Sequence, residues 1–544
     1  MKKFQFRSVV ALANAKLSIK FAAVLLSAST LVSALLGIFR DRLLNGYYLD
    51  TYPTGIDAYT AAFTIPDFMF FILTSGALAV SFIPVFNQRL IAGNKKSAWE
   101  LSTSTLNLMA LATLVASILI MVFADPLIRY VVGPVLDESG TILAINMMRV
   151  IAINPFLFSI ATVLSSIQQA VGRFVFYALA PALYNVGILI GITVFTGGIN
   201  IFGIQIFEGG IMGVALGVVF GAILQVIVSI IGLFGLGFDY EFKIYWKNHG
   251  FRSVLKLLPA RSLDQGIDYV NGIVSTNLSS RMGAGALRSY QQASSLHQMP
   301  VNLIGVAIST AFFPKLTEEV EDSNKFYDTF RTALRTITWI ALPVAVIAFF
   351  SRGYVVSFVK NGGDKLIASV LAALIVSVFA RSIFHIASRG FYARQDTKTP
   401  FIVSVIAVGL SMLLSVIFSL VFNWGPEGLG WAQSIGALVE IILLLGILEI
   451  QSKGKLLNHE YWSSLVRMLF ATLITGCVAY SMTKFLPLMS TDNSIFITFP
   501  KFFIITAVSA VTYLIAGYFL NIEEVKPIFA KIKKALFRNV SDSQ

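Results

Sequence analysis

The chain has 544 residues, of which 56% are hydrophobic and only 13% are charged, and its mean hydropathy is +0.78. Soluble proteins carry about 25% charged residues, so the composition excludes an ordinary soluble protein and indicates a polytopic membrane protein. The net charge of +13 comes from basic residues in short loops between apolar segments, a distribution typical of membrane-orientation signals rather than of a nucleic-acid-binding surface. The single cysteine, Cys477, excludes a disulfide framework and a thiolate metal site.

The first predicted membrane helix runs from Lys20 to Leu44, because twenty helical residues at about 1.5 Å each span the roughly 30 Å of a bilayer core. Small residues recur in it at every fourth position: Ser29, Ser33 and Gly37. This face can pack closely on a neighbouring helix. Arg40 and Asp41 follow about one turn later, so we expect the charge pair to point at protein or water rather than at lipid. The alternatives are an interfacial anchor and a structural ion pair.

Further apolar segments predict an all-α protein with about fourteen transmembrane helices. After the first, the predicted spans are residues 57–86, 97–124, 140–170, 174–197, 211–236, 264–283, 288–313, 328–350, 366–390, 400–422, 427–450, 464–487 and 499–521. An even number of spans puts both termini on one side of the membrane. The loops on that side carry most of the Lys and Arg residues, which predicts that both termini are cytoplasmic.

The order of the segments predicts two lobes. Residues 1–238 form an N-lobe with spans one to six, and residues 239–262 form a basic amphipathic linker on the membrane surface. Residues 263–451 form a C-lobe with spans seven to twelve, and residues 452–544 contain the last two spans and a basic tail. The two lobes have similar segments, which run from Ile65-Pro66 to Phe82-Ile83-Pro84 and from Met299-Pro300 to Phe312-Phe313-Pro314. This echo suggests two six-helix lobes in a parallel pseudo-repeat, with a substrate route between them.

The most specific motif is Gly390-Phe391-Tyr392-Ala393-Arg394-Gln395-Asp396-Thr397-Lys398-Thr399-Pro400, before the eleventh predicted span. A second motif, Ala180-Pro181-Ala182-Leu183-Tyr184-Asn185, lies in the fifth span, and the first two spans contribute the segments Ser33–Asp41 and Asp57–Pro66. Together these segments resemble the lipid II flippase (MurJ/MviN) family of the multidrug, oligosaccharidyl-lipid and polysaccharide exporter superfamily. The chain is similar to a divergent member of that family.

The resemblance implies a transporter of the bacterial cytoplasmic membrane. Such a flippase moves the undecaprenyl-pyrophosphate-linked peptidoglycan precursor, lipid II, from the inner to the outer leaflet by alternating access. It implies no catalytic residues and no cofactor, and its partners are the lipid-linked oligosaccharide, membrane lipids and, as further candidates, cell-wall synthesis proteins. The chain lacks a phosphate-binding Walker loop, so ATP is not expected to drive transport directly.

The resemblance carries over only three charged residues of the family's substrate cavity, and these are the predicted substrate-binding residues: Arg40, Asp41 and Asp57. Positions where the family has charged side chains are occupied here by Ala34, Phe70, Phe71 and Ser295. A pyrophosphate needs cationic donors, and arginine binds phosphate oxygens in pairs. The identity of the headgroup therefore stays open. The alternatives are a flippase or exporter for another polyprenyl-linked glycan or amphiphile, and a non-transporting scaffold for cell-wall synthesis.

Other charged residues are weaker candidates for functional sites. Asp264 and Asp268, one helical turn apart, are candidates for a coupling-ion or proton site, or they pair with Arg261. Three arginines are expected at turns or helix interfaces rather than at the headgroup: Arg281, Arg288 and Arg381. The loop residues Arg394, Asp396 and Lys398 are expected to brace a cytoplasmic turn and tune a gate. The four histidines show no metal-ligand spacing, so no metal site is expected.

Overall fold

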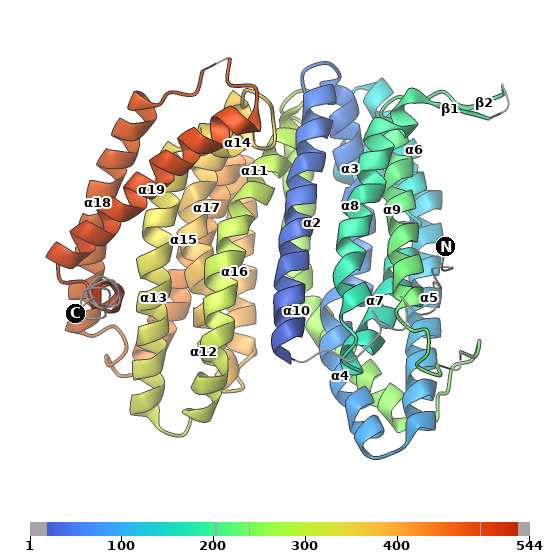
Figure 1. Cartoon of the computed structure of the whole chain (residues 1–544), viewed down its shortest axis with the longest axis horizontal. Coiled ribbons are helices and arrows are strands. Elements are labelled where there is room, and N and C mark those ends of the chain that lie inside the picture. Colours follow the sequence, from blue (N-terminus) through green and yellow to red (C-terminus); the bar gives the residue numbers. More distant parts are fainter. Residues whose placement is uncertain (1–18, 202–203, 239, 490, 531–544) are drawn as a thin grey trace, which may run out of the picture. The chain divides into compact units, whose positions relative to one another are not determined.

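The computed structural model describes residues 19–201, 204–238, 240–489 and 491–530. These residues are almost entirely helical (Figure 1), which confirms the predicted all-α membrane protein. The only strands among them are β1 (Ile199–Ile201) and β2 (Ile204–Phe207), an antiparallel hairpin that pairs Ile199 with Phe207 and Ile201 with Ile204.

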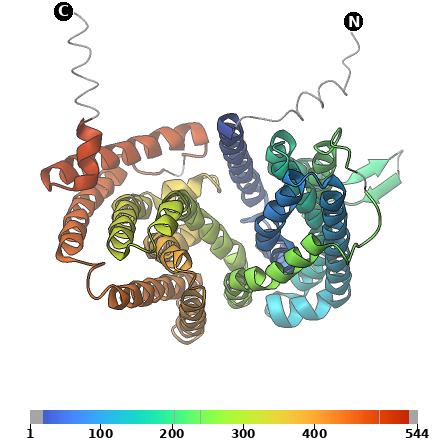
Figure 2. The same ribbon diagram turned by 90° about the horizontal axis from the view of Figure 1, so that it is seen from below.

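The chain divides into two compact units, residues 1–288 and 289–544. The helices of the first unit are α2 (Ile19–Tyr48), α3 (Pro53–Phe70), η1 (Phe71–Ser75), α4 (Gly76–Ile91), α5 (Lys95–Pro126), η2 (Leu127–Val132), α6 (Glu138–Ile151), α7 (Asn154–Ala170), α8 (Val175–Thr193), η3 (Phe195–Gly197), α9 (Met212–Ile231) and α10 (His249–Ser279). Figure 2 shows many of the longer helices of each unit close to end-on, whereas the red helix α19 (Ile495–Phe519) is seen from the side.

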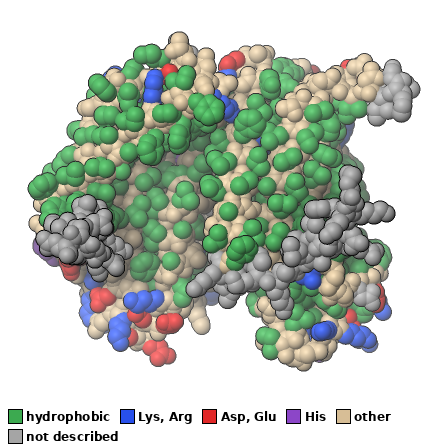
Figure 3. Space-filling view, viewed as in Figure 1, with side chains coloured by type: hydrophobic (Ala, Val, Ile, Leu, Met, Phe, Trp, Pro, Cys, Tyr) green, Lys and Arg blue, Asp and Glu red, His purple; other side chains and the backbone are tan. Residues whose placement is uncertain are grey.

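The second unit continues from α11, whose first residues precede the division between the units. Its helices are α11 (Ala286–Val301), η4 (Asn302–Val306), α12 (Ala307–Glu318), α13 (Ser323–Phe350), α14 (Arg352–Ser357), α15 (Lys365–Ala393), α16 (Lys398–Val416), η5 (Ile417–Val421), α17 (Pro426–Gln451), α18 (His459–Phe485), α19 (Ile495–Phe519) and η6 (Glu523–Val525). In each unit, hydrophobic side chains cover the sides of the helices, and charged ones gather near the lower ends in Figure 3. This distribution is that of a membrane-embedded helix bundle.

Thirteen helices in the described part of the chain are long and apolar enough to cross a membrane. They match every predicted span except the seventh, residues 264–283. In that region the chain forms α10, a helix of 31 residues that is too polar to be counted with the others. It carries Arg252, Lys256, Arg261, Asp264 and Asp268.

One helix joins the region predicted as a linker to the region predicted as the seventh span. The end of the predicted linker, residues 249–262, and most of the predicted seventh span form the single helix α10. This helix packs against α3, α4 and α5 of the first unit. The division into two compact units falls after Arg288, because the contacts of α10 join it to the helices that precede it. The predicted bounds of the two lobes and the linker stay a prediction.

Both segments of the predicted repeat contain the same irregularity. In α3, Pro66 lies a few residues before the π-helical turn η1, and in α11, Pro300 lies directly before the π-helical turn η4. Proline removes a backbone donor and disturbs the α-helical hydrogen-bond ladder, and π-helical turns occur frequently at functional sites.

The helices α8 and α9 pack closely enough to fix the position of α8. A Cβ atom on Gly187 would lie 2.2 Å from the Cα atom of Gly221, and one on Gly191 would lie 2.7 Å from the Cα atom of Gly217. Only glycine permits this approach. The contact matters for the site below, because Asn185 lies on α8 two residues before Gly187.

Candidate functional site

The helix α2 packs against α8 along part of its predicted small-residue face. Ser29 Oγ donates a hydrogen bond to the carbonyl oxygen of Ala178, and Asn185 Nδ2 donates to the carbonyl oxygen and the hydroxyl of Ser33 at 3.1 and 3.2 Å. The predicted close-packing face is therefore confirmed at Ser29 and Ser33. At Gly37 the described part of the chain shows no such packing, because beyond the backbone of α2 itself none of its atoms lies within 4 Å of the place that a Cβ would take.

Arg40 points toward α8, as the sequence predicts. Its Nε and Nη2 atoms donate to Asp41 Oδ1 at 3.2 and 3.1 Å, and its Nη1 atom donates to Asn185 Oδ1 at 3.0 Å. Because the amide nitrogen of Asn185 is engaged by Ser33, its carbonyl oxygen faces the guanidinium. The side chain of Arg40 is 25% exposed, so the cation is held in place while it stays accessible.

A second guanidinium shares the same carboxylate oxygen. Arg288 Nη2 lies 3.2 Å from Asp41 Oδ1, and Arg288 Nε donates to Asn45 Oδ1 at 2.9 Å. The side chain of Arg288 is only 8% exposed. We call these residues the Arg40–Asp41–Arg288 cluster. The sequence favoured a turn or interface position for Arg288 over a contact with the headgroup, and the structure places it both at the start of α11 and in this cluster.

Asp57 fixes the backbone that carries Arg288. It is 1% exposed, and its two carboxylate oxygens accept hydrogen bonds from the backbone N–H groups of Gly285 at 2.6 Å and Arg288 at 2.8 Å. The first N–H groups of a helix have no partner within that helix, and a carboxylate there is favoured by the helix dipole. Asp57 of α3 therefore caps α11, and this geometry suits a positioning residue better than a ligand of the substrate.

Three of the positions at which the resemblance implies charged side chains have apolar surroundings in the structure. The ring of Phe70 packs on that of Phe158 with centroids 5.3 Å apart, and Phe71 packs on Tyr269 at 4.2 Å. Ala34 instead lines a cavity of about 330 Å³ between α2 and α8. Positions 70 and 71 are therefore taken up by half-buried aromatic pairs, whereas position 34 borders a cavity.

Two of the arginines that were predicted at turns or helix interfaces have partners in such places, Arg281 at a turn and Arg381 at a helix interface. Arg281 Nε donates to Asn277 Oδ1, one turn earlier, at 3.2 Å. In the second unit, Arg381 of α15 lies 3.6 Å from Glu440 of α17, whose side chain is 2% exposed. This buried ion pair joins two packed helices and has a structural role.

Asp264 and Asp268 belong to the helical backbone of α10, but their side chains lie outside the described part, so the coupling-ion site stays a prediction.

The loop before α16 is braced by its own charged residues. Asp396 accepts hydrogen bonds from the backbone N–H of Lys398 and from the N–H and the hydroxyl of Thr399, at 3.1, 3.0 and 2.6 Å. These bonds hold the pKa of the Asp396 carboxyl below its usual value, with the Thr399 hydroxyl as the largest cause. Arg394 lies over the rings of Phe326 and Tyr327, 4.3 and 4.9 Å from their centroids. The geometry fits a brace, and a gating role stays a prediction.

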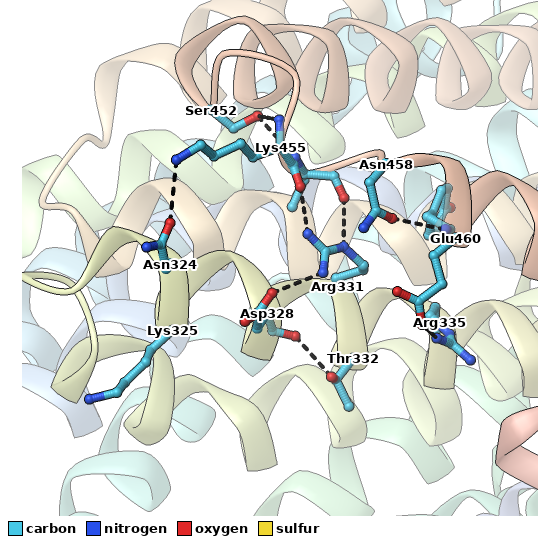
Figure 4. Close-up of polar contacts among 12 residues, drawn as sticks. Asn324, Lys325, Asp328, Arg331, Thr332, Arg335, Ser452, Lys455, Asn458 and Glu460 are labelled. Atoms are coloured by element: carbon cyan, nitrogen blue, oxygen red, sulfur yellow. Dashed lines mark hydrogen bonds and ion pairs between the residues drawn. The ribbon is translucent and has the colours of Figure 1, made fainter.

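A further charged cluster in the second unit joins α13 to the last two helices, and Figure 4 shows its contacts between α13 and the segment before α18. Arg331 of α13 donates to the carbonyl oxygens of Lys455 and Leu456, before α18. One turn later, Arg335 lies 2.8 Å from both Glu523 and Glu524, which follow α19. The sequence did not predict this charged cluster, because its residues come from three separate segments of the chain.

The chain is similar to known proteins over most of its length. Residues 53–499 match the family model of the lipid II flippase MurJ. The chain belongs to the lipid II flippase MurJ family. It is 26% identical to the probable lipid II flippase MurJ of Bdellovibrio bacteriovorus, over 93% of this chain and 95% of that protein. It is 27% identical to the lipid II flippase MurJ of Thermosipho africanus, over 79% and 86% of the two chains.

Solved structures of similar fold include a lipid II flippase and a multidrug transporter. A structure of the lipid II flippase MurJ in an inward closed conformation matches with a TM-score of 0.70 at 23% identity, over 90% of this chain and 98% of that one. An inward-facing multidrug transporter of the MATE family matches with a TM-score of 0.65 at 17% identity, over 80% and 98%. The predicted family is thus confirmed. It is a family of transporters rather than enzymes, with many membrane-spanning helices in the bacterial inner membrane.

Proposed function

We propose that this protein moves lipid II from the inner to the outer leaflet of the cytoplasmic membrane by alternating access, with both chain ends in the cytoplasm. Membership of the family supports the reaction. The observation that carries the proposal in this chain is the Arg40–Asp41–Arg288 cluster, in which two guanidiniums are held next to each other in the first unit.

The cluster has the chemistry that a pyrophosphate requires. A guanidinium has five N–H donors in a planar fork that matches phosphate oxygens in pairs. Within the described residues Arg40 makes three hydrogen bonds and Arg288 makes two through its side chain, so both retain donors. Asp41 keeps the two like charges together when no anion is bound. Arg40, the more exposed of the two arginines, is the first contact of the headgroup in this proposal.

The other residues of the site position these donors. Asn185 orients Arg40 through its carbonyl oxygen, and Asn45 does the same for Arg288. Asp57 holds the first turn of α11, which fixes the backbone of Arg288. A buried side chain locked by such contacts loses little further freedom when it binds a ligand. With the other cations that the resemblance implies absent from this chain, Arg40 and Arg288 are the ordered cationic donors that remain for the headgroup.

One observation favours a second candidate function. The aromatic packing of Phe70 and Phe71 occupies places where the family has charged residues, and a scaffold that recruits cell-wall synthesis proteins without transport would tolerate such a change. The scaffold hypothesis requires no accessible cation, however, and the 25% exposure of Arg40 supports the flippase instead.

The test is transport by the purified full chain in liposomes that contain lipid II, a polyprenyl-linked glycan with a different headgroup, or a cationic dye. We expect the exposure of lipid II on the opposite leaflet to be accelerated over protein-free liposomes. Acceleration of the other glycan alone, or export of the dye alone, would reassign the substrate. A folded protein that accelerates none of the three would favour the scaffold.

A further inference from the structure

A second cavity in the first unit lies apart from the Arg40–Asp41–Arg288 cluster. It has a volume of about 720 Å³ and is formed by α5, α7, α9 and the segment that follows α9. This volume falls within the roughly 300–1,000 Å³ that is typical of small-ligand sites. Its walls are apolar, with Leu111, Ile160 and Phe234 among them, and polar side chains occur only at one end. We call this cavity the α5–α9 groove.

A polar strap closes that end of the groove. The strap, residues 240–245, is tied to α5 by the side chain of Asn107, whose Nδ2 atom donates to the carbonyl oxygens of Glu241 and Lys243 at 2.8 and 3.0 Å. Tyr240 donates its hydroxyl to Asn107 Oδ1 at 2.8 Å. Ser104 Oγ accepts the backbone N–H of Tyr245 at 2.8 Å. The strap is therefore ordered by specific bonds, and the groove is formed before any ligand enters it.

The groove opens toward lipid. Leu111 of α5 and Phe234 after α9 line it and are 54% and 52% exposed, and Phe242 of the strap is 91% exposed. Both α5 and α9 are membrane-spanning helices, so their exposed apolar side chains contact hydrocarbon. Tyr240, Phe242 and Trp246 mark the level where aromatic residues gather, at the boundary between hydrocarbon and headgroups. The groove thus runs from the headgroup level into the bilayer core.

The charged group at the mouth of the groove is a lysine. Lys243 lines the groove, with its Nζ atom 5.0 Å from the centroid of the Tyr245 ring, and no ion pair of Lys243 is found among the described residues. The neighbouring acid, Glu241, instead accepts the hydroxyl of Tyr245. The mouth therefore attracts an anion at the headgroup level.

We propose that the α5–α9 groove is a binding site for an anionic phospholipid. One acyl chain lies along Leu111, Ile160 and Phe234, and the phosphate lies at Lys243. The charge of Lys243 selects anionic over zwitterionic headgroups, and the shape of the groove selects an acyl chain. This site is separate from the headgroup cluster of the proposed flippase, and lipid retention is measured without transport, so the two proposals stand or fall independently.

The test measures retained lipid by native mass spectrometry of the purified full chain. The protein is supplied with phosphatidylglycerol or phosphatidylethanolamine of the same acyl composition. We expect one phosphatidylglycerol to be retained in preference, and Lys243→Gln to weaken its binding about fivefold, since a basic residue near an anionic lipid surface contributes about that factor. Lys247→Gln, the same change outside the groove, is the matched control and should weaken binding less than twofold.

A second pair of variants tests the cavity itself. Ala110→Trp fills the groove from α5 and should abolish preferential retention, whereas Val122→Trp, on the same helix at an exposed position outside the groove, should not. The melting temperature shows whether each variant is folded, and Lys243→Gln remains the test if Ala110→Trp is not. Equal retention of the two phospholipids by the wild type, an unchanged affinity in Lys243→Gln, or displacement of phosphatidylglycerol by an equimolar polyprenyl phosphate would overturn the proposal.

Discussion

Substituting Arg40 with Gln tests the headgroup contact most directly. Glutamine keeps a polar side chain of intermediate length at position 40 and removes the charge. Asp41 stays paired, because Arg288 Nη2 lies 3.2 Å from the same carboxylate oxygen. The pair is partly buried, with the side chains of Arg40 and Asp41 25% and 15% exposed, so the remaining contact with Arg288 is what keeps the carboxylate from being left without a cation. We therefore expect the variant to fold and to reach the membrane at the level of the wild type.

The effect on substrate binding should be much larger. A hydrogen bond to a charged group contributes about 1.5–3 kcal/mol, and loss of one such contact with the pyrophosphate corresponds to a roughly ten- to hundredfold weaker affinity. The assay is binding of lipid II to the purified protein, followed by flipping in liposomes and complementation of a flippase-depleted strain. Arg42→Gln is the matched control, since it makes the same charge change two residues away on α2.

The result that would refute this reasoning is specific. If Arg40→Gln binds lipid II within twofold of the wild type while folded protein levels are equal, the guanidinium does not contact the headgroup. The same conclusion would follow if Arg42→Gln weakened binding as much as Arg40→Gln, because the effect would then reflect net charge near α2 rather than the cluster.

Three further predictions concern other parts of the chain. Ala34→Arg should fold, because position 34 borders a cavity of about 330 Å³, and should tighten lipid II binding in the same assay. Arg335→Ala should lower the free energy of unfolding by about 2–3 kcal/mol, seen as a lower melting temperature, because Glu524 with its 14% exposed side chain loses a 2.8 Å partner. The lowered pKa of Asp396 means that its stabilising contribution is complete above the unfolded value of about 3.9 and disappears as the pH falls through the folded value. The melting temperature of Asp396→Asn should therefore fall less than that of the wild type on acidification below about pH 4.

The sequence predicted the membrane helices well, because long apolar segments determine membrane spans almost independently of tertiary contacts. The region of α10 is the exception. Its charged residues make it look like a surface linker followed by a separate span, and whether such a helix lies on the membrane or packs against α3 and α4 depends on neighbours that periodicity does not reveal. The compact units divide after Arg288, because α10 packs on the helices that precede it, whereas the predicted start of the C-lobe at residue 263 stays a prediction.

The candidate site was only partly predictable, for a similar reason. Arg40 and its direction followed from the position of the small-residue face within one helix. Arg288 pairs with a residue 247 positions away, and Asp57 caps a helix 228 positions away. Such pairings depend on which helices pack together, and the local sequence around Arg288 indicates only a turn. The motif that contains Asn185 was recognised, but its contact with Arg40 became visible only when α8 was placed beside α2.

The different roles of Arg40 and Asp41 can be separated by experiment, although the two residues share one ion pair. Asp41→Asn leaves both positive charges near the headgroup but removes the carboxylate that holds the guanidiniums of Arg40 and Arg288 at 3.1 and 3.2 Å. Their mutual repulsion is then uncompensated in a site where both are partly or fully buried, so stability should fall by about 1.5–3 kcal/mol. An incoming pyrophosphate supplies the missing negative charge, and affinity should therefore change little. Arg40→Gln should do the reverse, with weak binding in a stable protein. Equal losses of stability and affinity in both variants would mean that the cluster is only a structural ion pair.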